Sequence, residues 1–223
     1  LPVGLQLPLD GNHLQNERFR EQLDASEPLK KQMWQQTVAS KILGQAIVLE
    51  GQGVGNKNML AWAKSVRSGD VENLEGRAAA YYWRNVFHNP DFVRGQEGDP
   101  PNNLLNYGYA IVRAMVARAL VATGLLPTLG IHHHNRYNAY CLADDMMEPY
   151  RPFVDELVYQ IVESGVDYEV LTKELKGKLL TIPTLEVVIS GKRSPLMVAV
   201  GQTTASLYKC FGGELRKISY PEM

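Results

Sequence analysis

Apolar side chains recur every three or four residues along most of this chain, a spacing that is typical of amphipathic α-helices. Pro28 and Pro195 favour helix starts at their positions, and Gly124 ends the most hydrophobic helix. The helices expected from this pattern cover residues 13–25, 28–49, 58–66, 71–87, 99–123, 139–147, 152–163, 167–178 and 195–211. The sequence therefore predicts a mainly α fold, a multi-helix domain.

Two short segments have a different pattern, which predicts strands. Within residues 5–9 leucines alternate with other residues before a turn-forming Asp-Gly pair, which indicates an N-terminal edge strand. Residues 185–189 predict a second short strand near the C-terminus, followed by a turn at residues 191–194. The N-terminal strand has no evident pairing partner in this sequence, and a lone strand is not stable by itself.

Composition places the chain in the ordinary globular class, because 45% of its 223 residues are hydrophobic and 21% are charged. The most apolar stretch, residues 110–129, contains two arginines, a glycine and a proline, which argues against a membrane span. No secretion leader opens the chain, so we expect a cytoplasmic protein without a membrane partner. Cys141 and Cys210 form no closely spaced pair and are expected to be packing residues.

Charge is distributed unevenly, although the formal net charge is only −1. Residues 139–169 carry eight acids against one arginine, whereas residues 170–217 carry eight bases against three acids. An acidic cluster flanked by basic surface suits a cation site that acts on phosphates, because lysines and arginines position the phosphate backbone. Solvated helix faces would give the same composition, so charge alone leaves both interpretations open.

Candidate chemistry is concentrated in residues 130–152, where a loop with three histidines leads into a helix with three carboxylates. Asp144 and Asp145 lie four and three residues before Glu148, so each shares a helix face with it, and such a pair can hold one cation. Pro149 ends the helix, and the Glu148 side chain can then turn toward the histidine loop. Oxygen ligands suit magnesium, while an added imidazole favours manganese. A polar loop before a solvated acidic helix is the alternative interpretation.

This segment resembles the active-site region of CRISPR-associated integrases, specifically of the form that accompanies an RNA-guided effector nuclease. In that family a glycine stands three residues before a metal-binding histidine. Acids follow twelve and fifteen residues after the histidine, and a Pro-aromatic-Arg-Pro sequence comes next. Gly130, His133, Asp145 and Glu148 have this spacing, and residues 149–152 read Pro-Tyr-Arg-Pro.

Other motifs extend the resemblance over nearly the whole chain. The family's remaining ligand is a glutamate that opens a Glu-Gly-x-Ala-Ala helix, which matches residues 75–79. Further agreement comes from residues 34–36 (Trp-Gln-Gln), 99–102 (Asp-Pro-Pro-Asn), 104–109 (Leu-Leu-Asn-Tyr-Gly-Tyr) and 203–207 (Thr-Thr-Ala-Ser-Leu). Several separated motifs in the right order are far harder to obtain by accident than any one of them.

The resemblance implies a metal cofactor and a set of ligands. Glu75, His133 and Glu148 would be the catalytic residues that bind Mn²⁺ or Mg²⁺, and Asp145 would support the site or act as an alternative ligand. The histidines on either side of His133 would be neighbours rather than ligands. Four arginines are candidates for DNA contact, although each is individually better explained as an ordinary surface or structural residue: Arg77, Arg84, Arg136 and Arg151.

The resemblance also implies an activity, the insertion of captured foreign DNA into a CRISPR array by two catalytic subunits and a small partner subunit. A 3′-hydroxyl of the incoming DNA attacks a phosphodiester of the repeat, and water as the nucleophile gives endonuclease activity instead. The family normally begins with a small β domain that builds a homodimer. Residues 1–10 are expected to be the remnant of that domain and its linker, and residues 11–223 the helical catalytic domain, so we expect poor two-ended integration.

Two alternatives from other classes remain open. The first is a non-catalytic DNA-binding or assembly module, which metal-dependent cleavage would rule out. The second is a metal-dependent phosphoesterase that acts on nucleotides or small esters, which activity on branched DNA but not on small esters would rule out. The sequence does not indicate which repeat or which fragment length is recognised.

Overall fold

The structure is a computed structural model, and it describes residues 14–223. The strand expected within residues 5–9 lies outside the described residues, and so does the expected division of the chain at residue 10. Both therefore stay predictions.

Helices make up most of the described chain, which confirms the mainly α class. They are α1 (Gln15–Asp24), α2 (Glu27–Gly51), α3 (Lys57–Ser65), α4 (Leu74–Asn85), α5 (Asn102–Thr123), α6 (Cys141–Met147), α7 (Arg151–Glu163), α8 (Lys173–Leu179) and α9 (Leu196–Phe211). Short 3-10 helices occur at η1 (Ser68–Asp70), η2 (Glu148–Tyr150) and η3 (Ile182–Thr184). The strands of the described residues are β1 (Glu186–Ile189) and β2 (Lys192–Pro195), which pair antiparallel.

The strand expected at residues 185–189 is confirmed as β1, but the turn expected at 191–194 is wrong. The reversal needs only Ser190 and Gly191, which both have positive φ, at 52° and 74°. Two such residues make the tight turn that a hairpin favours, so pairing resumes at once between Ile189 and Lys192. Pro195 ends the hairpin and caps α9, as its position before that helix predicts.

Helix boundaries differ from the sequence pattern where side chains cap the ends. The helix expected from residue 167 begins at Lys173, because the Thr172 hydroxyl accepts a hydrogen bond from Leu175 N at 3.3 Å. The end of α5 agrees with the sequence pattern, because Gly124 adopts the left-handed conformation that ends this helix.

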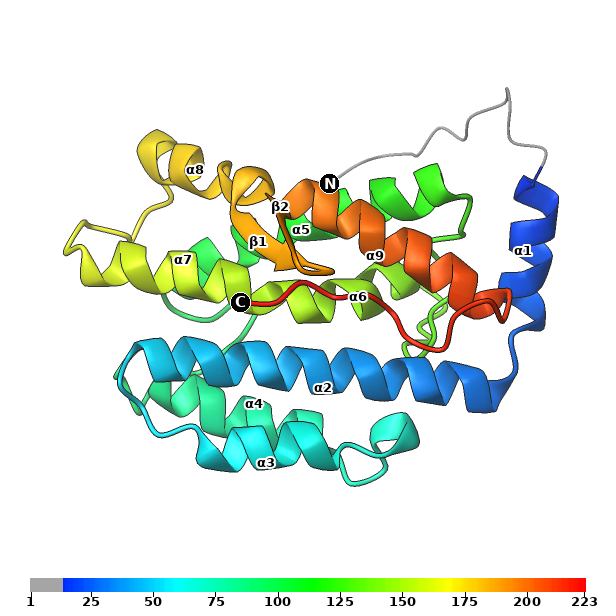
Figure 1. Ribbon diagram of the computed structural model, residues 1–223. Helices are drawn as coiled ribbons and strands as arrows, with labels where there is room; N and C mark the ends of the chain where they lie inside the picture. The colour runs from blue at the N-terminus through cyan, green and yellow to red at the C-terminus, as the bar shows by residue number, and fades with distance from the viewer. Residues whose placement is uncertain (1–13) are drawn as a thin grey trace.

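Figure 1 shows the helices in two layers that meet along α2. Helices α3 and α4 lie on one side of α2, and α6, α7 and α9 lie on the other. Gly44 permits the close approach of α7, since a Cβ there would lie 3.0 Å from Pro152 Cγ. Because α2 packs against both layers, its side chains can contact side chains from either layer.

Helix α5 forms the centre of the second layer. It packs against α6, α7 and α9, and a Cβ at Gly108 would lie only 2.4 Å from Val154 Cγ1 of α7. By length and composition alone α5 could cross a membrane, but half of its most apolar stretch is buried inside the protein. The arrangement is that of a core helix.

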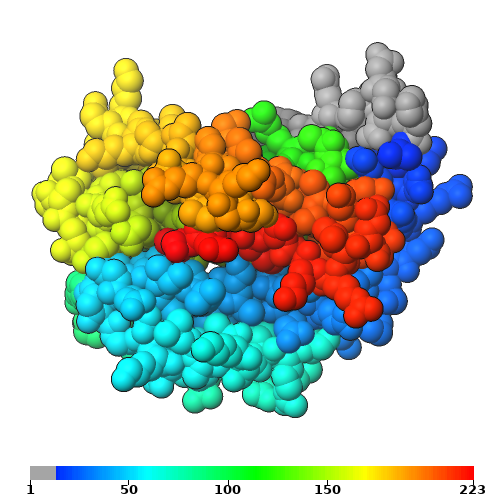
Figure 2. Space-filling view, in the orientation of Figure 1, coloured from blue at the N-terminus to red at the C-terminus, as the bar shows by residue number. Residues whose placement is uncertain are grey.

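The C-terminal segment lies in the seam between the two layers, and Figure 2 shows it in red between the blue-cyan and orange parts of the surface. Glu222 N donates to Val188 O of β1 at 2.7 Å, and the hydroxyls of Tyr220 and Thr37 are 2.7 Å apart. The segment thus joins β1 to α2. Cys141 and Cys210 are buried and free, as expected of packing residues.

Candidate metal and DNA site

Two carboxylates from distant parts of the chain face one ammonium group. Glu75 lies in the first turn of α4 and Glu148 begins η2, while Lys41 comes from α2. The Lys41 Nζ atom is 2.7 Å from Glu75 Oε1 and 2.5 Å from Glu148 Oε2. The fold therefore brings together two of the residues that the resemblance implies as ligands, and places a cationic group between them.

Glu148 is the more buried of the two carboxylates, with 5% of its side chain exposed. Burial by itself would raise its pKa, but the positive charges of Arg151 and Lys41 outweigh burial and lower the pKa below its usual value. Arg151 NH2 lies 2.9 Å from Glu148 Oε1. Oε2 receives no well-directed hydrogen bond, although the ammonium is close, so its contact with Lys41 is one of charge. This carboxylate stays ionised inside the protein.

The start of α4 is built to hold Glu75 at the layer boundary. Both carboxylate oxygens of Asp70 accept backbone hydrogen bonds, from Leu74 N and Glu75 N, each at 2.9 Å. The Asn73 side chain accepts another from Gly76 N at 3.2 Å. A Cβ at Gly76 would lie 2.7 Å from Asn73 Oδ1, so the glycine after the glutamate makes room for the helix cap.

The histidine loop is held by the buried carboxylate of Asp145. Its Oδ2 accepts hydrogen bonds from the backbone N–H groups of Ile131 and His132, at 2.7 and 3.0 Å. Its Oδ1 lies 2.5 Å from His133 Nδ1. A Cβ at Gly130 would come within 2.3 Å of His133 O and 2.8 Å of Asp145 Oδ2, so only glycine fits at this point of the loop.

This hydrogen bond orients the His133 ring and distinguishes it from its neighbours. Because Nδ1 faces Asp145, Nε2 is the nitrogen left to bind another group. The hydrogen bond to Asp145 raises the His133 pKa, burial opposes it, and the charges of Asp145, Glu148 and Glu75 add to the rise. His132 instead stacks flat on Trp34, with ring centroids 4.1 Å apart, and burial followed by the charge of His133 lowers its pKa.

Within residues 14–223, no group of three or more His, Cys, Asp or Glu side chains is arranged to hold a metal ion. The ammonium of Lys41 lies between two of the predicted ligands, within 2.7 Å of a carboxylate oxygen of each. The set Glu75, His133 and Glu148 stays a prediction. Asp145 uses both of its oxygens on the histidine loop, which suits a supporting role better than direct ligation.

Lys41 was missed by reasoning from the sequence. The signal that could have found it is its position on α2, seven residues after Trp34 and therefore on the same helix face. That face is otherwise buried and apolar, through Trp34, Val38 and Ile42. A lysine on a buried apolar face needs an acidic partner, and neither carboxylate is close to it in sequence.

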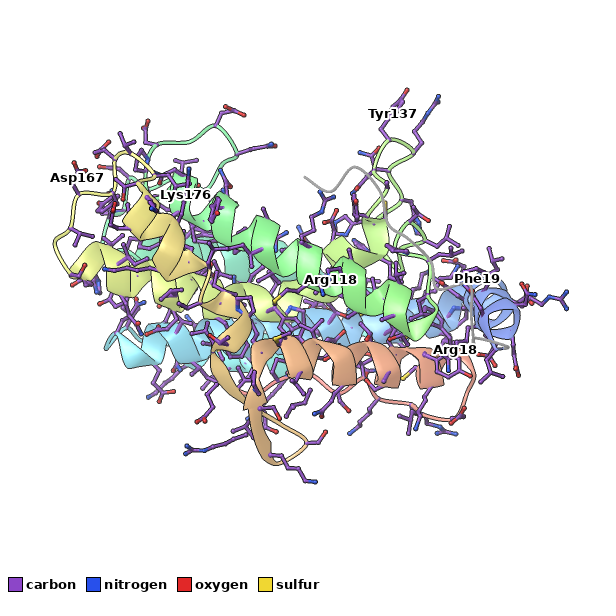
Figure 3. All side chains as sticks on the ribbon, turned by 90° about the horizontal axis from the view of Figure 1, so that it is seen from above. Arg18, Phe19, Arg118, Tyr137, Asp167 and Lys176 are labelled. Atoms are coloured by element: carbon purple, nitrogen blue, oxygen red, sulfur yellow. The ribbon has the colours of Figure 1, made fainter. Side chains whose placement is uncertain are left out.

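The four candidate arginines occupy different environments. Arg151 is the one that contacts a candidate ligand, Glu148. Arg77 is exposed and its guanidinium lies 4.8 Å from the centre of the Trp62 ring. Arg84 is exposed in the last turn of α4. Arg136 stacks at 4.8 Å over Tyr137, and Figure 3 shows Tyr137 at the outer end of the loop between α5 and α6.

A cavity of about 320 Å³ opens beside the histidine loop. His133, His134 and Arg136 line it from the loop, and Gln22 and Lys30 line it from α1 and α2. The His133 side chain is 47% exposed, so solvent and ligands can reach it. An anionic substrate entering here would meet basic and imidazole groups first.

Comparison with known sequences identifies relatives along most of the chain. The family model described as CRISPR associated protein Cas1 matches residues 13–190. A CRISPR-associated endonuclease Cas1 of Neisseria meningitidis serogroup C is 38% identical over 208 residues, which cover 92% of this chain and 68% of that protein. The CRISPR-associated endonuclease Cas1 2 of Pyrobaculum aerophilum is 33% identical over 155 residues, 68% of this chain and 51% of that protein.

Solved structures share the fold. A casposase bound to integration product superposes with a TM-score of 0.76 at 21% identity, over 97% of this chain and 74% of that one. A partial Cas6-RT-Cas1–Cas2 complex gives a TM-score of 0.78 at 18% identity, over 99% and 78%. These identities show a common fold and no more. The sequence match over most of the chain goes further, and with the Neisseria relative it shows that this chain belongs to the Cas1 family of CRISPR-associated proteins.

Proposed function

We propose that this chain is the catalytic part of a metal-dependent DNA endonuclease and integrase that inserts short DNA fragments into a CRISPR array. Family membership supports a DNA-cutting activity, because the Neisseria relative is named an endonuclease. The casposase of similar fold is bound to an integration product, which supports strand transfer. The chain spans 68% and 51% of the two relatives compared above, so the activity of the whole protein is part of the proposal.

The observation that carries the proposal is the convergence of Glu75 and Glu148 on one cationic group, near a histidine whose Nδ1 faces Asp145 and leaves Nε2 for a ligand. The donor set fits a divalent ion. Two carboxylates with an imidazole suit Mn²⁺, and Mg²⁺ would be held mainly through the oxygens. Glu148 Oε2 has no directed hydrogen bond, and Asp145 orients His133 as carboxylates orient metal-binding histidines.

The residues of the chain have distinct tasks in this proposal. A bound Mn²⁺ or Mg²⁺ would supply Lewis acidity and stabilise the charge that builds on the phosphoryl oxygens. Glu75, Glu148 and His133 Nε2 would hold it, and Asp145 keeps His133 in the required tautomer. The Lys41 ammonium balances the two carboxylates and would move aside on metal binding, because two cations cannot share the space between them.

The proposed reaction is a transesterification. A 3′-hydroxyl oxygen of the incoming DNA forms a bond to the phosphorus of a repeat phosphodiester, and the bond from that phosphorus to its 3′-oxygen breaks. The hydroxyl loses its proton and the departing 3′-oxygen gains one, so charge balances over the step. With water as the nucleophile the same bonds give hydrolysis, which is the endonuclease activity.

Partners follow from the same proposal. The compared structures include Cas1–Cas2 complexes, which supports a small partner subunit for this chain as well. We further propose DNA fragments and repeat DNA as substrates, a homodimer for the full-length protein, and action in the cytoplasm. The assignment of residues 1–10 to the end of a β domain belongs to this proposal.

A strand-transfer assay with short duplex DNA and a repeat-containing target tests the function. We expect products with Mn²⁺ or Mg²⁺ and none with a chelator. His133→Ala should lose at least about 100-fold in rate, since one ligand is removed. The matched control is His134→Ala, a histidine of the same loop without a predicted ligand role, which should keep most of the activity. A dead His134 variant with an active His133 variant would show that the ligand assignment is wrong.

A further inference from the structure

A second cavity, of about 300 Å³, is lined by Arg151, whose guanidinium contacts the Glu148 carboxylate. It opens between α5, the loop before α5, and the end of α6. The residues that line it and carry polar side chains include three arginines and one acid: Arg94, Arg113, Arg151, Asn106 and Asp144. Three guanidinium groups around one small cavity are unusual and call for negative partners.

Two of the three arginines have acidic partners, and one does not. Arg113 Nε lies 2.6 Å from Asp144 Oδ1. Arg151 NH2 lies 2.9 Å from Glu148 Oε1. Arg94, within the described residues, donates only to neutral oxygens: Gly95 O, Asn102 Oδ1 and Asn106 Oδ1, at 2.7 to 2.8 Å. Arg94 is therefore a guanidinium of the cavity lining that contacts no acid among the described residues.

A buried acid beyond the cavity acts on these arginines through its charge. Asp155 accepts hydrogen bonds from the hydroxyls of Tyr82 and Tyr109, at 3.1 and 2.5 Å, and burial raises its pKa while the charges of Arg151 and Arg94 lower it. The Nε atom of Arg151 is buried, and none of residues 14–223 supplies a hydrogen-bond acceptor to it. A buried N–H without an acceptor is costly, so a ligand that accepts there would be favoured.

One tyrosine ring fixes the two relevant guanidinium groups. The Tyr109 ring centre is 5.1 Å from the Arg94 guanidinium and 4.7 Å from that of Arg151. Two like charges on one ring repel each other, and an anion that binds both would offset that repulsion. Positive charge from two guanidinium groups beside one small cavity suits an anion such as a phosphate.

We propose that Arg94 and Arg151 bind a backbone phosphate of the DNA strand that is being processed. The non-bridging oxygens would accept hydrogen bonds from the Arg94 guanidinium and from Arg151 Nε. Because Arg151 also contacts Glu148, the bound phosphate would lie one guanidinium group away from a proposed metal ligand. It would hold the strand beside the reacting phosphodiester rather than take part in the reaction. This inference rests on the proposed function and adds a site to it.

The test measures DNA affinity against salt concentration, without divalent metal, so that no cleavage takes place. Arg94→Gln should weaken binding roughly tenfold whatever the sequence and reduce the salt slope of log K by about 0.9, the effect of one lost phosphate contact. Arg193→Gln is the matched control. It removes the same charge from an exposed position on β2 and should leave the slope unchanged.

A second variant covers the case in which loss of Arg94 unfolds the loop. Asn106→Asp keeps the shape of the Arg94 partner and adds a negative charge that neutralises the guanidinium. It should reduce the slope by the same amount. If Arg94→Gln and Asn106→Asp both retain the slope of Arg193→Gln, the phosphate site is wrong.

Two further outcomes separate this inference from the proposed function. Normal metal-dependent strand transfer with an unchanged slope in both variants would overturn the phosphate site alone. The expected slope change with no cleavage in Mn²⁺ would support the site and overturn the proposed activity. Thermal unfolding in sodium phosphate tests whether the cavity binds a free anion instead. If phosphate stabilises the native chain but not Arg94→Gln, and DNA binding is unchanged in that variant, the cavity is a small-anion site and the proposal for DNA is overturned.

Discussion

Lys41 has the most specific role that the structure assigns to a single residue. Its side chain is 11% exposed, and its ammonium binds both Glu75 and Glu148. Burial alone would lower its pKa, but the two carboxylates outweigh burial and raise it, so the group stays charged. A buried lysine that balances two candidate ligands makes the site stable without metal and makes metal compete with the chain's own cation.

Replacing Lys41 with methionine should therefore lower the stability of the metal-free chain and increase the stabilisation that metal provides. In a chelator, Lys41→Met removes the ammonium that Glu75 and Glu148 share, although Glu148 keeps its contact with Arg151, and the free energy of unfolding should fall by on the order of 3 kcal/mol. Mn²⁺ should restore more of the stability in Lys41→Met than it adds to the native chain, because no ammonium competes with it. Urea unfolding with and without MnCl₂ measures both effects.

Lys31→Met, an exposed lysine on the same helix, is the matched control and should show neither effect. Equal responses to Mn²⁺ in the Lys41 and Lys31 variants would contradict the competition between lysine and metal.

The histidine loop shows how far single residues can be read from sequence. The spacing from Gly130 to Glu148 selected His133. In the structure the His133 ring is hydrogen-bonded to Asp145, whereas the His132 ring stacks on Trp34. The close approach that requires Gly130 could not be predicted, since it depends on Cys141 and Asp145 packing against the loop. The Asn73 cap of α4 could not be predicted either, because that residue adopts a left-handed conformation.

Among the elements, α4, α5 and α7 are tied together by one buried carboxyl. Asp155 of α7 accepts hydrogen bonds from Tyr82 of α4 and Tyr109 of α5. Burial raises its pKa from 3.8 to about 7, although both hydrogen bonds and nearby arginines act against that rise. The helix that carries Glu75 and the helices that line the cavity of Arg94, Arg113 and Arg151 are thus joined through a carboxyl group that is half protonated near neutral pH.

This group makes stability depend on pH. The folded chain holds the proton to higher pH than the unfolded chain, so the contribution of Asp155 is fully present below about pH 3.8 and is lost as the pH rises through about 7. The loss over that window amounts to up to about 4 kcal/mol. Asp155→Asn cannot titrate, and its unfolding free energy should fall less than that of the native chain between pH 4 and about 7.

Denaturant unfolding at several pH values gives the two curves, and their difference isolates the group from other titrations. Asp24→Asn, an exposed position at the end of α1, is the control and should follow the native curve. Parallel curves for Asp155→Asn and the native chain would show that Asp155 is ionised throughout.

The elements themselves were largely predictable, because helices of ten or more residues leave a clear period in the sequence. The exceptions have local causes. β2 was interpreted as a turn because Lys192, Arg193 and Ser194 carry no apolar alternation, and the edge of a two-stranded sheet does not need it. The helix expected from residue 167 begins later because Thr172 provides the cap.

At the scale of the whole molecule, the site exists only where the two layers meet. Glu75 comes from one layer, Glu148 and His133 come from the other, and Lys41 lies on the helix between them (Figure 1). Glu75 and His133 are 58 residues apart in sequence, and no local pattern could join them. The family resemblance predicts that they share a metal ion, and the structure brings Glu75 and Glu148 to one ammonium group. Lys41 and the arginine cavity came from tertiary packing alone.

If Glu75, His133 and Glu148 bind one divalent ion in exchange for Lys41, crystals soaked in MnCl₂ and measured at the manganese absorption edge will show the ion in place. We expect one anomalous peak in contact with Glu75, Glu148 and His133 Nε2, with the Lys41 ammonium withdrawn from both carboxylates. An ammonium that still bridges the carboxylates, with no manganese peak there or with the peak on other residues, would show that this exchange does not take place.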